Sequence, residues 1–428
     1  MESRYTSVQS VQNLSLGRAN IRWKSIPIPL LVIWIIGMLD KIGVAVIATN
    51  QKFLTDMHLI GQNALIGSLV TALLFSYGVG YFFWGWLTDR FGPKRCGVVG
   101  LILWAISTGL AAISPNFTAL FISRCILGLS EAFLWPVSNS LTARWFPQSE
   151  RGRAKSIWIN GVSIGAGISG FVVLGLLQLT TWRGIFWVLT GLAILVCLPM
   201  ILILVKDDPE KDSRVSEEEL KHIKSEPVHI NGKESNDKPA LLTNSYWLIV
   251  VSFTATTLGV YGLGTWFPSY LNKFMHFSPG STSVIMLFAW GAAMLLTFWV
   301  GSRIDKTKKK AVWNIVGFTG AAIVLVLTLF GLSAVADAIM VGAAVALIQG
   351  FTTPIGQGLI HSISKTDNIG MDTGVMSGFS NIIAAFGPTI MGALITVGHG
   401  TYIYSFAFLI IVFLISAVCG VILKKRGY

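Results

Sequence analysis

Residues 28–48 read IPLLVIWIIGMLDKIGVAVIA, an apolar run in which Asp40 and Lys41 are the only charged side chains. A helix that spans a membrane needs about 20 consecutive residues that are mostly apolar. A charge near the bilayer centre costs roughly 3 kcal/mol on the mildest scale, so such residues usually face a bundle interior or a water-filled cavity. The run therefore predicts a spanning helix that carries a functional pair of charges.

Eleven further runs of this kind follow in the 428-residue chain, which is 53% hydrophobic and only 12% charged. A soluble domain carries roughly 25% charged residues, and the runs are too long and too uniformly apolar for the strands of a barrel. We expect an all-α membrane protein with twelve transmembrane helices in two six-helix halves. The predicted spans are approximately 28–48, 64–87, 97–114, 117–141, 156–178, 185–205, 246–271, 282–302, 312–333, 338–361, 373–396 and 402–423.

The net charge of +12 reflects topology rather than a nucleic-acid partner. If the N-terminus is cytoplasmic, 27 of the 32 Lys and Arg residues fall in cytoplasmic segments, while the external loops hold only Lys52, Arg183 and Lys273. Cytoplasmic loops of membrane proteins carry this excess of positive charge. Both termini are therefore predicted to be cytoplasmic, in a multi-pass protein of a prokaryotic cytoplasmic (inner) membrane.

The longest polar stretch divides six spans from six. We expect a cytoplasmic N-terminal segment at 1–27, a first bundle at 28–205, a linker loop at 206–244, a second bundle at 245–423 and a tail at 424–428. Within the linker, Ser216 followed by Glu217-Glu218-Glu219 predicts a capped helix on the membrane surface.

A sequence element repeats in the two halves. GWLTDRFGPKR at 85–95 follows the second span, and GSRIDKTKKK at 301–310 follows the eighth. Parallel six-span repeats are a transporter architecture. The first copy resembles motif A of the major facilitator superfamily, through Gly85, Asp89, Arg90, Gly92 and Arg95, and the second copy keeps Asp305. The resemblance implies a conformational role, in which Asp89 caps a helix and pairs with a basic residue of the other half.

The fourth span also contains charges. Arg124 and Glu131 are seven residues apart, two helical turns, and so project from the same face. Gly128, Ala132 and Pro136 are small or kinking residues that suit a helix lining a cavity. The two spans thus each contribute one acid and one base.

The fourth span extends the resemblance. RCILGLSEA at 124–132 with Trp135-Pro136, LDKIGVA at 39–45, WFPSYL at 266–271 and the Gly, Asn and Pro pattern of 374–392 are similar to the anion:cation symporter family. That family includes sialin-like, galactonate and hexuronate permeases. The resemblance implies alternating access and proton-coupled import of a small organic anion, a sugar acid or another carboxylate, with the proton gradient as driving force and no cofactor.

The resemblance also implies roles for the four charges. Asp40 and Glu131 would carry protons, and Lys41 and Arg124 would bind the anion. The family usually has arginine at position 41; lysine is a point charge without the bidentate fork, so we expect Arg124 to be the main ligand. The alternative is that the four residues form ion pairs that only hold the bundle together.

Uncharged polar residues within the spans are candidates for reading substrate hydroxyl groups. The best placed are Tyr77, Asn160, Tyr261 and Asn381. Each has a plainer alternative, an interhelical hydrogen bond worth about 0.6 kcal/mol.

No enzymatic site is predicted. The patterns G-x-S-x-G at 161–165 and G-x-G-x-x-G at 165–170 lie inside one span, where small residues favour helix packing, and the six histidines fall in loops or at span ends, which does not favour a metal site. The expected partners are an organic anion, protons and the bilayer, with no nucleic acid, and we expect a monomer. Two other functions stay open: an anion uniporter or exchanger without protons, and a membrane sensor that binds the anion without moving it.

Overall fold

The structure is a computed structural model that describes residues 21–225, 240–307, 310–363 and 369–428. Throughout these ranges the regular elements are helices, and twelve helical segments are long and apolar enough to cross a membrane. The predicted fold class and number of spans are confirmed.

The spans of the N-terminal half are α2 with α3 (Ile21–Ser25, Pro27–Ile47), α5 (Asn63–Phe91), α6 (Pro93–Ala112), α7 with α8 (Phe117–Glu131, Leu134–Trp145), α9 (Gln148–Leu179), and α10, η1 and α11 (Trp182–Leu192, Ala193–Cys197, Leu198–Leu204). The spans of the C-terminal half are α13 with η4 (Asn244–Ser269, Tyr270–Phe274), α14 (Pro279–Thr307), α15 (Lys310–Thr328), α16, η5 and α17 (Ala334–Leu347, Ile348–Thr352, Thr353–Ile363), α18 with α19 (Ile369–Ala384, Gly387–Val397) and α20 (Ile403–Lys425). Short helices outside the spans are α4 (Gln51–Asp56), η2 (Pro209–Lys211), α12 (Glu217–Ile223) and η3 (Ala240–Leu242).

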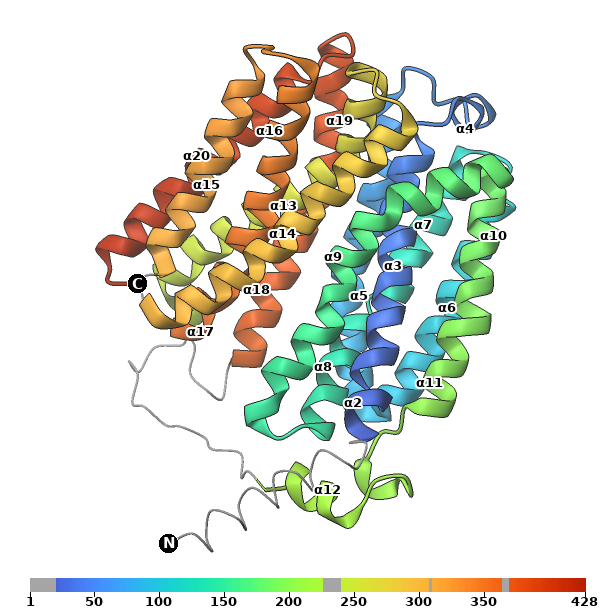
Figure 1. Cartoon of the computed structure of the whole chain (residues 1–428), viewed down its shortest axis with the longest axis vertical. Coiled ribbons are helices and arrows are strands. Elements are labelled where there is room, and N and C mark those ends of the chain that lie inside the picture. The colour runs from blue at the N-terminus through green and yellow to red at the C-terminus, as the bar shows by residue number, and fades with distance from the viewer. Residues whose placement is uncertain (1–20, 226–239, 308–309, 364–368) are drawn as a thin grey trace, which may run out of the picture.

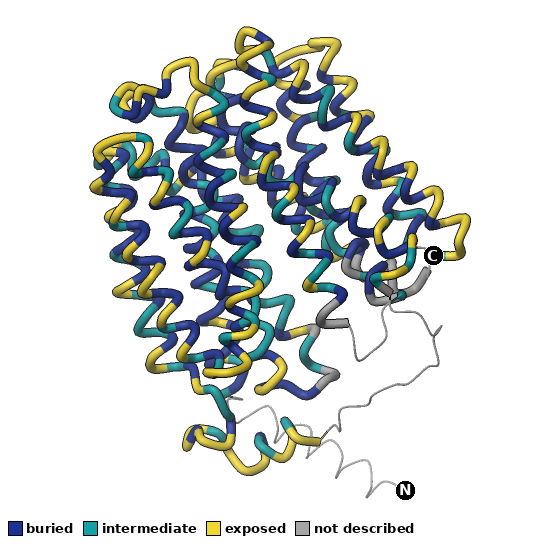
Figure 2. The backbone as a smooth tube through the Cα atoms, turned by 180° about the vertical axis from the view of Figure 1, so that it is seen from behind, coloured by how far each residue is buried: buried dark blue, intermediate teal, exposed yellow. Residues whose placement is uncertain are grey.

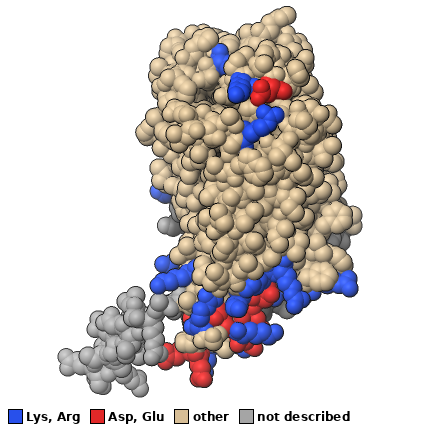
Figure 3. All heavy atoms as spheres, turned by 90° about the vertical axis from the view of Figure 1, so that its right-hand side faces the viewer, with Lys and Arg blue, Asp and Glu red and all other residues tan. Residues whose placement is uncertain are grey.

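The two halves stand side by side, and the start of α2 and the end of α20 lie toward the same end of the molecule (Figure 1). We call this the basic end, because Lys and Arg side chains gather there with several carboxylates, whereas the middle of the molecule shows an uncharged surface (Figure 3). Exposed residues run along the outer faces of the helices (Figure 2). Many of them are large and apolar, among them Leu195, Phe288 and Ile203 at 76%, 73% and 67% exposure. An apolar belt between charged ends is the surface that a bilayer requires.

Glycines allow the closest helix contacts. A Cβ added at Gly161 would lie 2.7 Å from the carbonyl oxygen of Leu31, and one at Gly165 would lie 2.6 Å from that of Ile35. Gly161 and Gly165 therefore pack α9 against α3, while Gly170 approaches Ser283 of α14, so the predicted helix-packing role of 161–170 is confirmed.

The halves meet most tightly toward the end opposite the basic end. A Cβ at Gly67 of α5 would lie 2.4 Å from the carbonyl oxygen of Pro388 in α19, and one at Gly392 would lie 2.4 Å from that of Asn63. The Thr71 hydroxyl donates to the carbonyl of Ala385 at 2.6 Å. Toward the basic end the ribbons of the two halves diverge (Figure 1).

An ion-pair network joins the linker to the first half at the basic end. Arg22, which is 4% exposed, contacts Glu150 of α9 at 3.0 Å and Glu219 of α12 at 3.2 Å. His222 of α12 also contacts Glu150, at 3.1 Å. The side chain of Ser216 accepts from the backbone N–H of Glu219, so the predicted cap of this helix is confirmed.

Candidate functional site

The four intramembrane charges lie around α3, but they pair between spans rather than within them. Asp40 contacts Arg124 at 3.0 Å, and Lys41 contacts Glu131 at 3.3 Å. Successive helical residues point about 100° apart, so Asp40 and Lys41 face different neighbours. The two turns between Arg124 and Glu131 give each a partner on α3.

Asp40 is sealed inside the N-terminal half. It is 0% exposed, and its Oδ1 accepts a hydrogen bond from Nη1 of Arg124 at 3.0 Å. Its Oδ2 accepts from Nε1 of Trp104 and Oγ1 of Thr108 in α6, both at 2.9 Å. A buried carboxylate with an ion pair and three hydrogen bonds is well compensated for the loss of water.

Arg124 is equally buried but less well satisfied. It is 1% exposed, and its guanidinium carbon lies 4.9 Å from the ring centroid of Phe186 in α10. Its Nε and Nη2 have no hydrogen-bond partner within the described part of the chain. Arg124 thus has two donors that are buried without an acceptor among the described residues. Each such unsatisfied donor normally costs about 1–3 kcal/mol.

Glu131 has a different environment from Asp40. Its side chain is 0% exposed, and neither carboxylate oxygen accepts a hydrogen bond from a described residue, so Lys41 at 3.3 Å supplies its one ionic contact in those ranges. Gly37 makes room for it: a Cβ there would lie 3.9 Å from Oε1 of Glu131 and 3.4 Å from Leu134.

The fourth span has a kink directly after Glu131. Helix α7 ends at this residue, Ala132 and Phe133 form a turn, and α8 begins at Leu134. Ala132 and Phe133 keep helical backbone angles, and Pro136 has no N–H to donate to the carbonyl of Ala132, so the span is one helix with a proline kink. The Gly128, Ala132 and Pro136 pattern favours such a kink without fixing its position.

Lys41 links Glu131 to aromatic side chains. Its Nζ lies 3.8 Å from the ring centroid of Tyr77 in α5 and 5.6 Å from that of Trp34. Tyr77 in turn makes an edge contact with Tyr81, with centroids 4.7 Å apart. A cation over aromatic faces is stabilised without being neutralised, so Lys41 stays available to an anion.

The C-terminal half contributes Tyr261 and Asn381 next to this cluster. The Tyr261 hydroxyl donates to Oδ1 of Asn381 at 2.7 Å, and the Asn381 amide donates to the carbonyl of Ser377 at 2.7 Å. A Cβ at Gly78, next to Tyr77, would lie 3.6 Å from the Cβ of Asn381. Tyr77 and Lys41 from one half thus come together with Asn381 and Tyr261 from the other.

Asn160 is not brought into this cluster by a contact. It lies partly buried on α9 and makes no hydrogen bond to a residue that the structure describes.

Sequence reasoning missed Lys155 of α9. Its Nζ lies 5.0 Å from the ring centroid of Trp135 and 5.9 Å from that of Trp158. Both rings contact Trp34, with centroids 5.8 Å and 5.9 Å away, and Trp34 also lies beside Lys41. Within the described ranges Lys155 has no carboxylate at ion-pair distance. The signal was present, because Lys155 and three tryptophans lie in or beside spans, but their meeting depends on how α3, α8 and α9 pack.

The motif A segment lies at the basic end. Asp89, Arg90 and Arg95 are exposed, and the Arg90 guanidinium lies 5.2 Å from the ring centroid of Trp86. A Cβ at Gly85 would meet no atom within 4 Å. The pairing of Asp89 with a basic residue is absent among the described residues in this conformation. The side chain of Asp305 lies outside the described part.

A residue outside the motif caps the helix after it. Gly92 has φ +88°, which turns the chain from α5 into α6, and Oδ1 of Asp207 accepts from the backbone N–H of Lys94 at 2.6 Å. A Cβ at Gly92 would lie 3.1–3.2 Å from the Asp207 carboxylate. The helix that follows the motif is therefore capped by a residue of the linker.

Comparison with known proteins agrees with this architecture. The family model described as Major Facilitator Superfamily matches residues 30–349. The chain belongs to the Major Facilitator Superfamily. With its twelve candidate spans it is a multi-pass membrane protein, and the relatives to which it is similar are named as transporters. In the described ranges there is no group of three His, Cys, Asp or Glu side chains that could hold a metal ion.

Several transporters that are named for their substrates are similar to the chain. It is 28% identical to the glycerol-3-phosphate transporter of Bacillus subtilis over 57% of its own length and 58% of that protein. It is 26% identical to a probable sulfoacetate transporter of Cupriavidus necator, over 56% of its length and 55% of that protein. The chain thus spans a little over half of these two relatives. The hexuronate transporter of Bacillus subtilis is 24% identical over 86% of the chain and 87% of that protein.

Solved structures of the superfamily share the fold. A bacterial homologue of the human lysosomal transporter Spinster, in an inward-facing and occupied conformation, aligns with a TM-score of 0.74. Sequence identity is 16%, and the alignment covers 96% of this chain and 98% of that one.

Proposed function

We propose that this chain is a proton-coupled symporter that moves a small organic anion, a sugar acid or another carboxylate, by alternating access. One observation carries the proposal. Lys41, the cation best placed for an anion at the meeting of the two halves, is held by Glu131, a fully buried carboxylate with no other ionic contact to a described residue.

Coupling follows from the cost of an unpaired buried charge. An anion that binds Lys41 takes the positive charge away from Glu131. Breaking a buried ion pair costs about 3–5 kcal/mol if the remaining charge stays uncompensated. Glu131 avoids this cost by taking up a proton, and it releases the proton when the anion leaves and Lys41 returns. Each anion is then accompanied by a proton.

The second pair has a related role. We propose that Asp40 is a further proton carrier and Arg124 a further anion ligand, as the family resemblance implies. The Nε and Nη2 donors of Arg124 support this, because they are buried without a hydrogen-bond partner among described residues. Since Asp40 and Arg124 are sealed between α3, α6 and α7 here, they would act in another conformation of the cycle.

Uncharged groups would then select among anions. Tyr261 and Asn381 form a hydrogen-bonded pair that can exchange one of its bonds for a substrate hydroxyl. Tyr77 and Asn160 are proposed to contribute from the first half. The relatives are named for glycerol-3-phosphate, sulfoacetate and hexuronate. All three are small anions, which supports this substrate class.

We propose further that the basic end faces the cytoplasm of a prokaryotic cell and that the protein works as a monomer. The distribution of Lys and Arg supports this orientation. The conformation described would then be closed to the outside, where Gly67 and Gly392 meet the other half. When the cytoplasmic side closes, Asp89 of motif A would pair with a basic residue of the other half. Asp305 would have the corresponding role in the second copy of the motif.

Uptake into proteoliposomes tests the proposal. The probes are glucuronate, galactonate, sulfoacetate and glycerol 3-phosphate, each offered with and without an imposed inward proton gradient. Symport predicts accumulation above equilibrium only with the gradient, together with acidification of the lumen. Glu131→Gln should lose accumulation and keep counterflow exchange, because Lys41 still binds the anion. The control is Glu217→Gln, an exposed carboxylate of α12.

Each other result identifies a different function. Uptake that ignores the proton gradient makes the protein a uniporter or exchanger. Saturable binding without flux makes it a sensor. Accumulation by Glu131→Gln equal to wild type removes Glu131 from the coupling step.

A further inference from the structure

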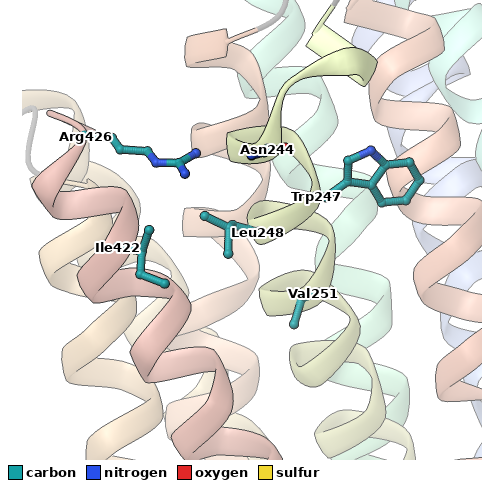
Figure 4. Close-up of a pocket in the computed structure, with 6 residues that line it drawn as sticks. All are labelled: Asn244, Trp247, Leu248, Val251, Ile422 and Arg426. Atoms are coloured by element: carbon teal, nitrogen blue, oxygen red, sulfur yellow. The ribbon is translucent and has the colours of Figure 1, made fainter.

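A groove on the outside of the C-terminal half lies between the start of α13 and the end of α20. Asn244, Trp247, Leu248, Val251, Ile422 and Arg426 line it, and its volume is about 350 Å³ (Figure 4). The groove lies at the basic end, at the limit of two spans, and takes no part in the site between the halves.

The lining residues are ordered by depth. Asn244, Leu248 and Val251 follow one face of α13 at helical spacing, and Ile422 and Arg426 point toward them from α20 (Figure 4). The polar residues, Asn244 and Arg426, thus lie at the outer limit of the spans, and the apolar residues lie deeper. This order, with polar residues outside and apolar residues deeper, matches the headgroup and the acyl chain of a phospholipid in the adjacent leaflet.

The apolar part faces the bilayer. Val251 is 43% exposed and Ile422 37% exposed on the outside of the bundle. Trp247 is also exposed, at 43%, and tryptophan at a span end lies at the level of the headgroups. The helices cross a membrane, so a lipid chain must cover this surface.

The polar part favours an anion. The Nη1 of Arg426 donates to Oγ of Ser245 at 3.0 Å, which orients the guanidinium, and within the described ranges Arg426 has no carboxylate at ion-pair distance. Lys424 and Lys425 add positive charge at the same helix end. Basic residues at a membrane surface attract anionic lipid at roughly 1 kcal/mol each.

We propose that this groove binds one anionic phospholipid, with its phosphate on Arg426 and Asn244 and an acyl chain along Leu248, Val251 and Ile422. The guanidinium fork suits two phosphate oxygens at once. Bound there, the lipid would link the first and last spans of the C-terminal half at the basic end.

Native mass spectrometry of the purified full chain tests the site, with phosphatidylglycerol and phosphatidylcholine as probes. We expect the first phosphatidylglycerol to bind about tenfold more tightly than phosphatidylcholine. Arg426→Gln should remove this preference. Val251→Trp, which fills the groove without changing charge, should weaken the binding of both lipids. Lys425→Gln is the matched control, because it removes the same charge at the same helix end outside the groove.

Three results would overturn the proposal: an unchanged preference in Arg426→Gln, an equal loss in Lys425→Gln, or unchanged lipid binding in Val251→Trp. A fourth would be displacement of phosphatidylglycerol by inorganic phosphate at equal concentration, which would make Arg426 a site for free anions.

Discussion

The ammonium of Lys41 lies 3.3 Å from the carboxylate of Glu131, and Glu131 has no other ionic contact with a described residue. Asp40, the neighbour of Lys41 in the chain, is by contrast fixed by Arg124, Trp104 and Thr108. Two acids that look alike in the sequence therefore differ in how easily they lose their partner. This difference makes Lys41 and Glu131 the pair that an incoming anion would separate.

Substrate binding should depend on the charge of Lys41. Lys41→Gln is expected to weaken anion binding by roughly tenfold or more, because one charge contact within the protein is worth more than about 1.4 kcal/mol. Lys41→Arg keeps the charge and should keep most of the binding. The measurement is the thermal stabilisation that the transported anion gives to purified protein. Lys52→Gln, at an exposed residue of α4 outside the spans, serves as control. Wild-type stabilisation in Lys41→Gln would contradict the proposed site.

Asp40 and Arg124 should show the energetics of a buried pair. Asp40→Leu leaves the guanidinium of Arg124 without a counter-charge and is expected to cost about 3–5 kcal/mol of stability. The double variant Asp40→Leu with Arg124→Met should recover a large part of that loss, because both charges are then absent. Thermal unfolding in detergent measures both. A double variant as unstable as the sum of the two single variants would show that the two residues do not act as a pair.

Gly67 should control closure at the end opposite the basic end. A Cβ at this position would lie 2.4 Å from the backbone oxygen of Pro388, so Gly67→Ala cannot close as described. Spin labels on Gln51 of α4 and on Ser278 in the loop before α14, both exposed at this end, should report a shift to longer distances, and uptake should fall. Gly175→Ala is the matched control, because a Cβ there meets no atom within 4 Å. Identical distance distributions in Gly67→Ala and wild type would contradict this role.

Lys155 should assist the anion between the central site and the basic end. It lies over Trp135 and Trp158 without a carboxylate partner in the described ranges. Lys155→Gln is expected to raise the KM for uptake by roughly tenfold, the effect of losing about 1.4 kcal/mol of attraction, and Lys155→Arg should preserve it. Initial uptake rates over a range of anion concentrations provide the measurement. An unchanged KM in Lys155→Gln would assign Lys155 to packing alone.

Asp56, the last residue of the short helix α4 after the first span, should make stability depend on acid pH. The Trp182 indole donates to its carboxylate at 2.8 Å and Arg183 lies 3.3 Å away; these contacts lower the pKa of Asp56 from its ordinary value of 3.8 despite partial burial. A lowered folded-state pKa stabilises the protein above the unfolded pKa, and this stabilisation is lost as pH falls through the folded pKa.

Asp56→Asn should therefore cost about 1 kcal/mol at neutral pH and nothing at a pH below the pKa of Asp56. Thermal unfolding of both proteins from pH 7 to 3 measures the difference. A cost that is the same at both ends of this range would rule out the carboxylate as its cause.

The spans and their number could be predicted because hydrophobicity over about 20 residues is a local property. The boundaries were less certain where charge and helix overlap. The first span begins at Ile21, not near residue 28, and α9 begins at Gln148, because Arg22 and Glu150 neutralise each other and allow charged turns to continue the helices.

The site could be predicted in its members but not in its pairing. The seven-residue spacing of Arg124 and Glu131 placed them on one face, and their burial followed from the apolar run around them. Which acid meets which base depends on the rotation of α7 against α3, a matter of packing. The contact of Lys155 with the Trp34 cluster and the cap that Asp207 gives α6 likewise join residues far apart in the chain.

Arg22 has a consequence for how the chain is assembled during synthesis. Its guanidinium is buried against Glu150 and Glu219, and Glu219 is made 197 residues later. All six helices of the first half have been synthesised before this second carboxylate exists. Until then the start of the first helix holds a buried cation with half of its counter-charge. The first half is therefore completed only when the linker folds onto it. A chain cut between residues 205 and 206 would lack the Glu219 carboxylate that pairs with Arg22.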